Sequence, residues 1–451
     1  MSSAKRNCKL IRFALYALAM FSSFADAIAA PTLSEADIRG SRIVHHAPGS
    51  LPDKPAGIFT GVDMMNLFIV VEAGDYHVTV LDGDRLESVH RFRSRHALQG
   101  TPQFTPDGRY VYFATRDGWI TKFDIWNLVV VAEILAGTDT RNIAISSDGN
   151  FLVVANDQPH ILVLLDAELN VLKVHAVKDK DGKESSGVSA VYDAAPRRSF
   201  VAALKDVPEI WEISYNPTAE DLPAGMIHDF RYREGTFLPG FLNPRRTSLS
   251  EPLADLLFTR EYSELMGIGR DPGKIQIINL DVRKKIANLN LPGIPHPGAG
   301  NHWTWQGKAV MAVPNSRDGV ISLIDVANWK LVNSTPVRGP GQIMRTHEKT
   351  PYAWTASVTG KSTGTILVFD KRSLSNVTEL AAGPGKTIAH VEFNRDATYA
   401  FASLAERKAA GGALIIFDAA TFKEVKRIPM DKPDAAYNVF NNIRRVDVAV
   451  H

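Results

Sequence analysis

Residues 105–124 read TPDGRYVYFATRDGWITKFD, a polar turn, an apolar strand, a second turn and a second strand ending in an aspartate. The pattern returns at residues 146–166, SSDGNFLVVANDQPHILVLLD, and at residues 394–418, NRDATYAFASLAERKAAGGALIIFD. Equivalent strand ends, 42 to 68 residues apart, are expected at or near Asp82, Asp124, Asp166, Ile213, Asp281, Asp325, Asp370 and Asp418. A period in the low forties with several short strands is typical of β-propeller blades. The sequence therefore predicts an all-β, eight-bladed propeller.

The first thirty residues differ from the rest. Four basic residues precede or interrupt an apolar run over residues 10–30 that ends in small residues, with Ala27 and Ala29 placed for cleavage. This pattern is typical of a secretory signal peptide, and its apolar core is shorter than a membrane-spanning helix. We therefore expect a signal peptide over residues 1–30 and no stable membrane span after cleavage. An uncleaved membrane anchor is the alternative.

Cysteine usage and charge narrow the possible functions. The only cysteine, Cys8, lies in the predicted signal, so the mature chain would have no disulfide, no thiolate metal site and no Cys-x-x-Cys-His attachment for c-type haem. Export without disulfides suits a bacterial periplasm. The formal net charge of +2 shows no polycationic bias, so we expect no nucleic-acid partner.

Three further segments complete the predicted organisation. Residues 31–58 are weakly patterned and are interpreted as an N-terminal lead-in to a propeller over residues 59–451. Residues 215–248 are rich in Pro, Gly and Arg and have no sustained period, which favours an insertion on a blade edge. Such an insertion could form a flap beside the central mouth. The strand-like residues 437–450 are expected to pair with the first blade and close the ring.

Four of the thirteen histidines have surroundings that suit a functional site. Each falls near the same point of its blade, before a polar turn or at the start of a strand: His96, His296, His347 and His390. Equivalent positions in a ring of repeats face the same way, so these side chains could converge on the axis. Neutral imidazoles suit iron binding or proton transfer. A surface or hydrogen-bonded structural role is the alternative for each.

Basic and aromatic residues accompany these histidines. Arg116, Arg141 and Lys205 occupy comparable blade positions, where cationic side chains could hold carboxylates; solvated strand ends are the alternative. Tyr352 and Trp354 could wall a planar ligand or fill gaps between blades.

Several stretches of the chain resemble the haem d1-binding family, which contains cytochrome cd1 nitrite reductase and its relatives in haem d1 biosynthesis. The resemblance extends over roughly residues 55–445 and rests on DMMNLFIVVEAGDYHVTVLDGD, SRHALQGTPQFTPDGRYVYFATRDGWITKFD, PHPGAGN, THEKTPYAW, PGKTIAHVEFNRD and YNVFNN. It implies an eight-bladed propeller of the cytochrome cd1 d1-domain type with a tetrapyrrole over its axis, in agreement with the repeat count.

The resemblance also implies roles for individual residues. His96 matches the axial ligand of the haem iron, and Arg116, Arg141 and Lys205 match basic residues that meet the acid side chains of the tetrapyrrole. A second group is implied to surround the other face of the ring and to carry the catalysis: His296, His347, His390 and Tyr437.

The chain departs from the family pattern at three places. Nothing in the mature sequence could attach the c-type haem that precedes the propeller in several members, so electrons would pass to or from a separate protein. Asn315 stands where the nitrite reductase has one of its two proton-donating histidines, and His347 matches the other. The usual Asn-Tyr of the third blade is replaced by Asn156-Asp157.

The residues and the resemblance together favour a periplasmic protein of haem d1 biosynthesis for denitrification. The branch that it resembles most dehydrogenates a propionate of dihydro-haem d1 to an acrylate, which would need non-covalent haem d1 or dihydro-haem d1 and an external electron-transfer cytochrome. Cytochrome cd1 nitrite reductase would receive the product. Three alternatives stay open: a precursor carrier or other biosynthetic protein, a nitrite reductase d1 subunit with a separate cytochrome, and a propeller that only scaffolds proteins.

Overall fold

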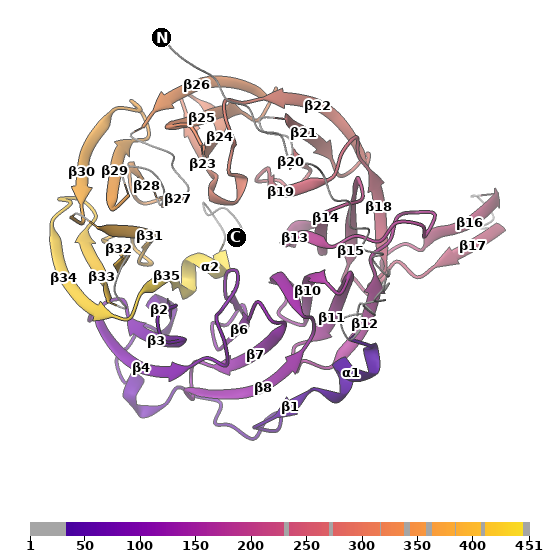
Figure 1. Cartoon of the computed structure of the whole chain (residues 1–451), viewed down its shortest axis with the longest axis horizontal. Helices are drawn as coiled ribbons and strands as arrows, with labels where there is room; N and C mark the ends of the chain where they lie inside the picture. Colours follow the sequence, from indigo (N-terminus) through magenta and orange to yellow (C-terminus); the bar gives the residue numbers. More distant parts are fainter. Residues whose placement is uncertain are drawn as a thin grey trace, which may run out of the picture. The chain divides into compact units, whose positions relative to one another are not determined.

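The computed structural model describes residues 33–229, 234–269, 274–315, 317–337, 343–357, 363–383, 385–406 and 411–444. The chain divides into two units, Met1–Thr32 and Leu33–His451, and the predicted signal peptide lies outside the described residues. The second unit is a ring of eight antiparallel sheets around a central hub (Figure 1). The predicted eight-bladed propeller is confirmed.

The first four blades, each given from the hub outward, have the following strands. Blade 1 is β35 (Pro433–Asn438), β2 (Leu67–Glu72), β3 (His77–Asp82) and β4 (Glu87–Arg93). Blade 2 is β5 (Gln103–Phe104), β6 (Tyr110–Ala114), β7 (Trp119–Asp124), β8 (Val129–Leu135) and β1 (Ile43–Val44). Blade 3 is β9 (Asp139–Ile145), β10 (Phe151–Gln158), β11 (Ile161–Asp166) and β12 (Val171–Ala176). Blade 4 is β13 (Val188–Ala194), β14 (Ser199–Leu204), β15 (Glu209–Ser214) and β18 (Pro244–Ser248).

The other four blades follow the same plan. Blade 5 is β19 (Leu253–Phe258), β20 (Glu264–Gly269), β21 (Lys274–Asn279) and β22 (Lys284–Asn290). Blade 6 is β23 (Asn301–Trp305), β24 (Lys308–Pro314), β25 (Val320–Asp325) and β26 (Lys330–Pro336). Blade 7 is β27 (Ile343–Thr346), β28 (Tyr352–Ala356), β29 (Thr365–Asp370) and β30 (Asn376–Ala381). Blade 8 is β31 (Lys386–Phe393), β32 (Tyr399–Glu406), β33 (Gly412–Asp418) and β34 (Glu424–Met430).

The aspartate that ends the third strand of most blades caps the turn that follows. In blade 1, Asp82 Oδ1 accepts the N–H groups of Asp84 and Arg85 at 2.9 and 3.1 Å. The same acceptor role recurs at Asp124, Asp166, Asp325, Asp370 and Asp418. Such side-chain-to-backbone bonds stabilise tight turns, so the sequence repeat is a repeated turn signal. In blade 5 the predicted strand end at Asp281 is wrong, because β21 ends at Asn279 and the Asn279 amide oxygen caps the turn instead.

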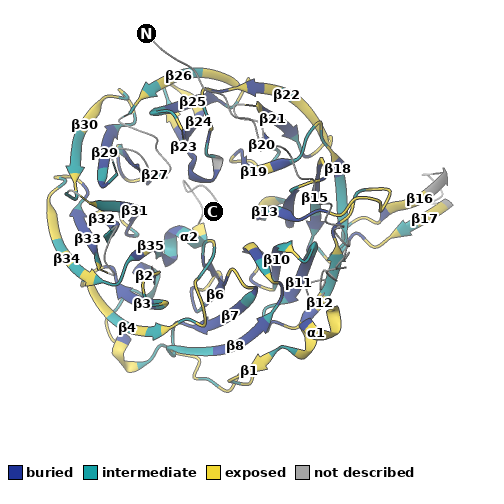
Figure 2. Ribbon diagram, in the orientation of Figure 1, coloured by how far each residue is buried: buried dark blue, intermediate teal, exposed yellow. Residues whose placement is uncertain are grey.

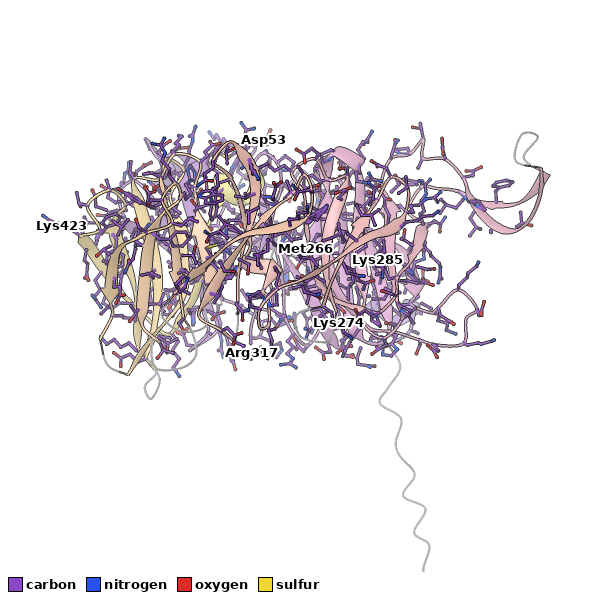
Figure 3. The ribbon with its side chains drawn as sticks, turned by 90° about the horizontal axis from the view of Figure 1, so that it is seen from above. Asp53, Met266, Lys274, Lys285, Arg317 and Lys423 are labelled. Carbon is purple, nitrogen blue, oxygen red and sulfur yellow. The ribbon has the colours of Figure 1, made fainter. Side chains whose placement is uncertain are left out.

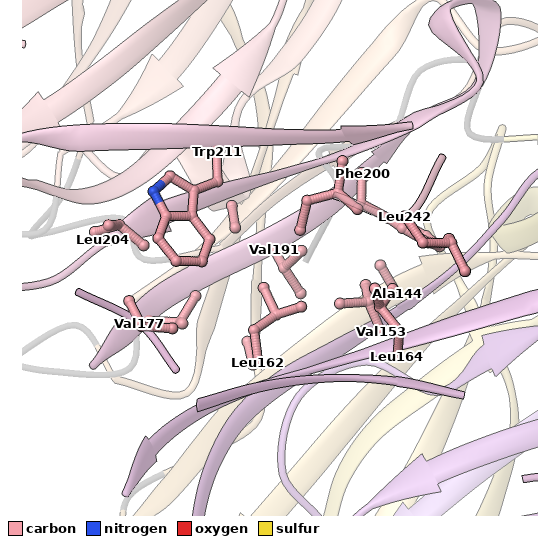
Figure 4. Packing of buried hydrophobic residues seen from close by; sticks show 14 of the residues in the cluster. Ala144, Val153, Leu162, Leu164, Val177, Val191, Phe200, Leu204, Trp211 and Leu242 are labelled. Atoms are coloured by element: carbon pink, nitrogen blue, oxygen red, sulfur yellow. The ribbon is translucent and has the colours of Figure 1, made fainter. Parts of the chain in front are cut away.

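Apolar side chains fill the spaces between neighbouring blades. Figure 4 shows part of the cluster between blades 3 and 4, in which Leu164, Phe200 and Trp211 are almost completely buried. Burying one such side chain contributes about 1.5–3 kcal/mol relative to leaving it in water. In Figure 2 the middle strands of the blades are largely buried, whereas the outermost strands carry most of the exposed residues. Packing between sheets therefore holds the ring together.

The C-terminal strand closes the ring. Strand β35 pairs with β2 in the register Ile69↔Tyr437, so blade 1 combines strands from both ends of the described chain. The predicted closure is confirmed, but the strand covers residues 433–438 and is followed by helix α2 (Val439–Arg444); the predicted strand at 437–450 is wrong over 439–444. Residues 445–450 lie outside the described residues.

The N-terminal lead-in packs on the outside of the ring. Helix α1 (Glu35–Gly40) begins with a capping box at Ser34 and buries Ile38 completely against blades 2 and 3. Strand β1 then adds to the outer edge of β8. This pairing covers the polar edge of blade 2. Short 3₁₀ turns lie at Gly57–Phe59, Met64–Asn66, Ala195–Arg197 and Pro297–Ala299.

The insertion after β15 forms a hairpin of β16 (Leu222–Asp229) and β17 (Glu234–Leu238). In Figure 1 this hairpin projects outward from the ring, beyond β15 and β18 and away from the hub. The expectation of a flap beside the central mouth is therefore wrong. The cause is topological: the insertion interrupts the step from the third to the outer strand of blade 4, which lies at the periphery.

The ring has two faces, which differ in the connections that they carry. Each blade is a meander that starts at the hub, so the connections into the inner strands and the turns between second and third strands share one face, called here the His96 face. The other turns and helix α2 lie on the opposite face, called the α2 face. Figure 3 shows Lys274 and Arg317 at one edge and Asp53, which is ion-paired with Arg109, at the other. Among the described helices, none is long and apolar enough to cross a membrane.

Candidate functional site

The connection that carries His96 is anchored by its neighbours. The Arg95 guanidinium lies 3.9 Å from the centre of the Trp119 ring and forms an ion pair with Glu133 at 2.9 Å. Ser94 Oγ donates to the backbone oxygen of His96 at 2.8 Å. The His96 side chain is itself 56% exposed, and its Nε2 lies 3.4 Å from Asp117 Oδ2. A fixed backbone thus presents an accessible imidazole on the His96 face.

The same connection runs along the inner side of blade 2 and touches both neighbouring blades. Leu98 forms a β-bridge with Thr115, and Gly100 adopts a positive φ of 73°. A Cβ at Gly100 would lie 3.3 Å from Cβ of Asn142 in blade 3, so a larger side chain would crowd that strand. On the other side, the Thr101 side chain bonds the Tyr437 hydroxyl of blade 1. The connection therefore links His96 structurally to Tyr437.

Three predicted basic residues lie on an arc of the His96 face over blades 2 to 4. Arg116 Nε lies 3.6 Å from Asp139, and Lys205 Nζ lies 2.5 Å from Asp157. Arg141 is exposed on β9. The structure thus brings the predicted cations to one side of the hub. There the carboxylates of a ligand would compete with Asp139 and Asp157 for the cationic side chains. Asp157, a departure from the family pattern, is the partner of Lys205.

Two of the predicted catalytic residues meet on the inner strands. The His390 ring of β31 lies 5.3 Å from the Tyr437 ring of β35. Burial, and then the nearby Arg345, lower the pKa of His390 far below its ordinary value, so the imidazole is neutral. Burial raises the pKa of the Tyr437 hydroxyl, so the phenol is protonated. Both side chains therefore enter any reaction uncharged.

Two charged residues that the sequence reasoning missed lie beside this pair. Arg345 of β27 is buried, and its Nη2 lies 3.2 Å from His390 Nε2. Glu392 is also buried and accepts the N–H of Phe393 at 2.9 Å and the amide of Asn441 at 3.4 Å. Burial raises the pKa of Glu392 to about 7 although Arg345 opposes this. In the sequence, each of these charged residues interrupts an apolar segment: Arg345 stands in IMRT and Glu392 in HVEF. This interruption is the signal that could have identified them.

His296 belongs to a second group, between blades 4, 5 and 6. Asp255 of β19 accepts the Tyr192 hydroxyl at 2.8 Å and the N–H of Gly298 at 3.1 Å. Burial raises the pKa of Asp255, and the neighbouring His296 opposes that rise. This group joins side chains and backbone of three neighbouring blades.

Asn315, the residue that replaces a histidine of the family pattern, has a structural role in the turn after β24. Its Oδ1 accepts the N–H groups of Ile294, Arg317 and Asp318, and its Nδ2 donates to the Pro292 carbonyl. The side-chain amide of Asn315 thus bonds the backbone of two connections, at residues 292–294 and 317–318. It is therefore not a substitute proton donor.

Three predicted site residues lie elsewhere. The expectation that four histidines share one blade position is wrong for His347. This residue follows the end of β27 and so lies toward the α2 face. Its Nδ1 accepts the N–H of Lys349. Trp354 is fully buried between blades 7 and 8 against Phe393. Tyr352 packs at 5.0 Å against Phe422. These aromatic residues fill space between blades, which was the alternative to a ligand wall.

A cavity of about 430 Å³ opens on the α2 face. It contains none of the predicted site residues, and the length of the inner strands separates it from His96 and Lys205. Its walls are turns of blades 2 to 6 and the end of α2, including Phe104, Ile145, Pro196, Phe258, His302 and Ile443. His96, Arg116, Arg141 and Lys205 therefore lie toward the His96 face, away from this cavity.

These features define the chain as a β-propeller with a histidine-bearing, partly basic site around its hub. Residues 62–442 match the family model described as cytochrome D1 heme domain. The chain belongs to this family, as the motifs predict.

The chain is similar to proteins of haem d1 metabolism at two levels of sequence identity. The chain is 44% identical to dihydro-heme d1 dehydrogenase of Pseudomonas aeruginosa (strain PAO1) over 422 residues, which cover 93% of the chain and 80% of that protein. It is 24% identical to nitrite reductase of Stutzerimonas stutzeri over 425 residues, covering 85% and 72%. A solved structure, dihydro-heme d1 dehydrogenase NirN in complex with DHE, superposes with a TM-score of 0.83 at 45% identity and covers 92% of the chain and 84% of that chain.

Proposed function

We propose that this protein binds dihydro-haem d1 at the His96 face and dehydrogenates one propionate side chain to an acrylate, in haem d1 biosynthesis for denitrification. The observation that carries the proposal is the 45% identity and TM-score of 0.83 to a dehydrogenase complex, over a hub that carries His96, His296, His390 and Tyr437. The 24% identity to nitrite reductase, with Asn315 occupied in a turn, gives less support to nitrite reduction.

The residues of the hub have separate tasks in this proposal. His96 binds the iron of the tetrapyrrole through one imidazole nitrogen. Arg116, Arg141 and Lys205 bind the acid side chains and fix the orientation of the ring. His296, His390 and Tyr437 surround the reacting side chain and handle its protons. When bound, the tetrapyrrole would supply the redox chemistry, and these residues would position it and handle protons.

The reaction removes two electrons and two protons from the propionate, so it needs an acceptor. The only cysteine of the sequence, Cys8, cannot form a Cys-x-x-Cys-His haem attachment. We therefore propose an external electron-transfer cytochrome as acceptor, a periplasmic location reached through a signal peptide at residues 1–30, and cytochrome cd1 nitrite reductase as the recipient of the product. The proposed boundaries of the propeller domain are residues 59–451, preceded by the lead-in at 31–58.

Anaerobic single-turnover mixing tests the proposal. Purified protein is loaded with dihydro-haem d1, an oxidised cytochrome or chemical oxidant is added, and the pigment is extracted and identified by absorption and mass. The proposal predicts loss of two hydrogens and the haem d1 spectrum. Tight binding without conversion would instead indicate a carrier, and rapid reduction of nitrite by the haem d1-loaded protein would indicate a nitrite reductase subunit.

A further inference from the structure

Arg345 makes a contact that constrains the chemistry of His390. Its guanidinium donates Nη1–H to the Met344 carbonyl at 3.1 Å, and its Nη2 lies 3.2 Å from His390 Nε2. A guanidinium has only donors and stays charged in proteins. His390 Nε2 must therefore accept this hydrogen bond with its lone pair. The proton of the neutral ring is then on Nδ1.

The other nitrogen of His390 is unpartnered within the part of the chain that the structure describes. His390 Nδ1 is buried and has no hydrogen-bond partner among the described residues, and the same holds for Arg345 Nε. A buried donor without a partner costs about 1–3 kcal/mol. A ligand atom that accepts a hydrogen bond from Nδ1 would recover this energy.

The groups around His390 come from three inner strands, which lie side by side next to the hub in Figure 1. Arg345 is on β27, Glu392 is on the same strand as His390, and Tyr437 is on β35, where Asp434 also acts on the Tyr437 hydroxyl. Glu392 is the carboxyl that most stabilises the charge of Arg345. Glu392 in turn bonds Asn441 of α2. The network therefore runs from helix α2 to His390.

We propose that Arg345 is a positioning residue that fixes His390 as a neutral imidazole with its proton on Nδ1, so that His390 meets the substrate as a hydrogen-bond donor. The acceptor is an oxygen of the tetrapyrrole periphery, such as the carboxylate of the reacting propionate. This deepens, and rests on, the proposed dehydrogenase function. It leaves proton removal to another hub residue.

The tautomer is measured in the ligand-free protein, independently of turnover. Two-dimensional ¹H–¹⁵N spectra of histidine-labelled protein identify His390 as the signal lost in His390→Gln. The proposal predicts a proton on Nδ1 and a lone pair on Nε2 at pH 7. Protonation at Nε2 would overturn it, whatever the fate of dihydro-haem d1. If no dehydrogenation occurs but Nδ1 carries the proton, the dehydrogenase function fails and the tautomer assignment stands.

Variants test the role of the contact. Arg345→Met removes the charge and the hydrogen bonds to His390 and to the Met344 carbonyl, whereas Arg345→Lys retains the charge. Arg197→Met, at a largely buried arginine paired with Glu212 in blade 4, is the matched control. We expect Arg345→Met to keep dihydro-haem d1 uptake within about twofold and to lower the single-turnover rate about tenfold or more, the loss typical when the partner of a reacting group is removed. Arg345→Lys should recover part of the rate, and the control should retain it.

The pH profile separates positioning from general damage. Without the guanidinium, His390 is easier to protonate, so the rate of Arg345→Met should fall toward low pH in a range where the wild-type rate does not. An Arg345→Met protein with the wild-type rate and pH profile would overturn the proposal. The proposal would also be overturned if correctly folded Arg345→Met lost the same fraction of its rate at every pH, because that result indicates a structural role only. If Arg345→Met does not fold, the tautomer of the wild-type protein decides alone.

Discussion

Replacing Glu392 by Gln should stabilise the folded protein, by an amount that grows as the pH rises from about 4.5 to about 7 and then levels off. Glu392 is 2% exposed, and burial raises the pKa of its carboxyl to about 7, against an ordinary value of 4.5. Gln is nearly isosteric and keeps an oxygen to accept the N–H of Phe393 and the amide of Asn441. The substitution thus removes the ionisation and with it the attraction to Arg345, which burial of Glu392 outweighs.

The size and sign follow from proton linkage. The unfolded chain loses the Glu392 proton near pH 4.5, while the folded chain holds it to about pH 7, so wild-type stability falls as pH rises through this window. At 1.36 kcal/mol for each pH unit, the full loss is about 3 kcal/mol. The advantage of Glu392→Gln in free energy of unfolding should therefore grow from about 0.8 kcal/mol at pH 5 to about 3 kcal/mol at pH 8.5.

Urea unfolding at several pH values, followed by tryptophan fluorescence, measures this difference. The control is Glu72→Gln: Glu72 is also buried, yet hydrogen bonds from Arg91 and Thr79 outweigh burial and lower the pKa of its carboxyl. Glu72→Gln should destabilise the protein at neutral pH, and the effect should diminish as pH falls through the folded pKa. A Glu392→Gln advantage that is independent of pH, or a net loss of stability at pH 8.5, would refute the reasoning.

Three further predictions concern the ring and its rim. Phe401→Ala should lower the free energy of unfolding by about 3–5 kcal/mol, because the fully buried Phe401 ring lies 4.1 Å from Phe68 across the closure between blades 8 and 1; a loss below about 1 kcal/mol in urea unfolding would contradict the role of that contact. Lys205→Met should weaken haem d1 binding about tenfold in a spectroscopic titration, because one charge-assisted contact to a carboxylate is lost; unchanged affinity would remove Lys205 from the site. Replacing residues 222–238 by a short Gly-Ser link should leave haem d1 uptake unchanged, since the hairpin projects away from the hub; lost uptake with the ring intact would show that the hairpin takes part in binding.

The blades could be predicted because each repeats the same local turn chemistry. Asp82 and its equivalents cap a turn within three residues of themselves, so a local sequence signal marks each blade. The departures occurred where that signal is ambiguous. In blade 5 an Asn at 279 does the capping two residues before the predicted Asp281. After β35 the chain continues as a short helix over residues 439–444, VFNNIR, where a strand was predicted.

The site was harder to predict because it depends on which end of a strand a residue occupies. His96 and His347 both stand near the ends of inner strands, but one precedes β5 and the other follows β27, which places them toward opposite faces. From the sequence, Trp354 could line a ligand site, yet in the structure its side chain packs against the neighbouring blade. Arg345 and Glu392 interrupt apolar strands, and only the ring brings β27 beside β31. Contacts between blades carry no local sequence signal.

The central claim, that one imidazole of the His96 face binds the iron of a tetrapyrrole at the hub, is tested most directly by absorption and EPR spectra of protein loaded with haem d1. The wild-type protein should show a spectrum characteristic of histidine coordination. His96→Ala should lose this signature, whereas His46→Ala, in the lead-in on the outer edge of blade 2, should keep it. An unchanged spectrum in His96→Ala would contradict the account.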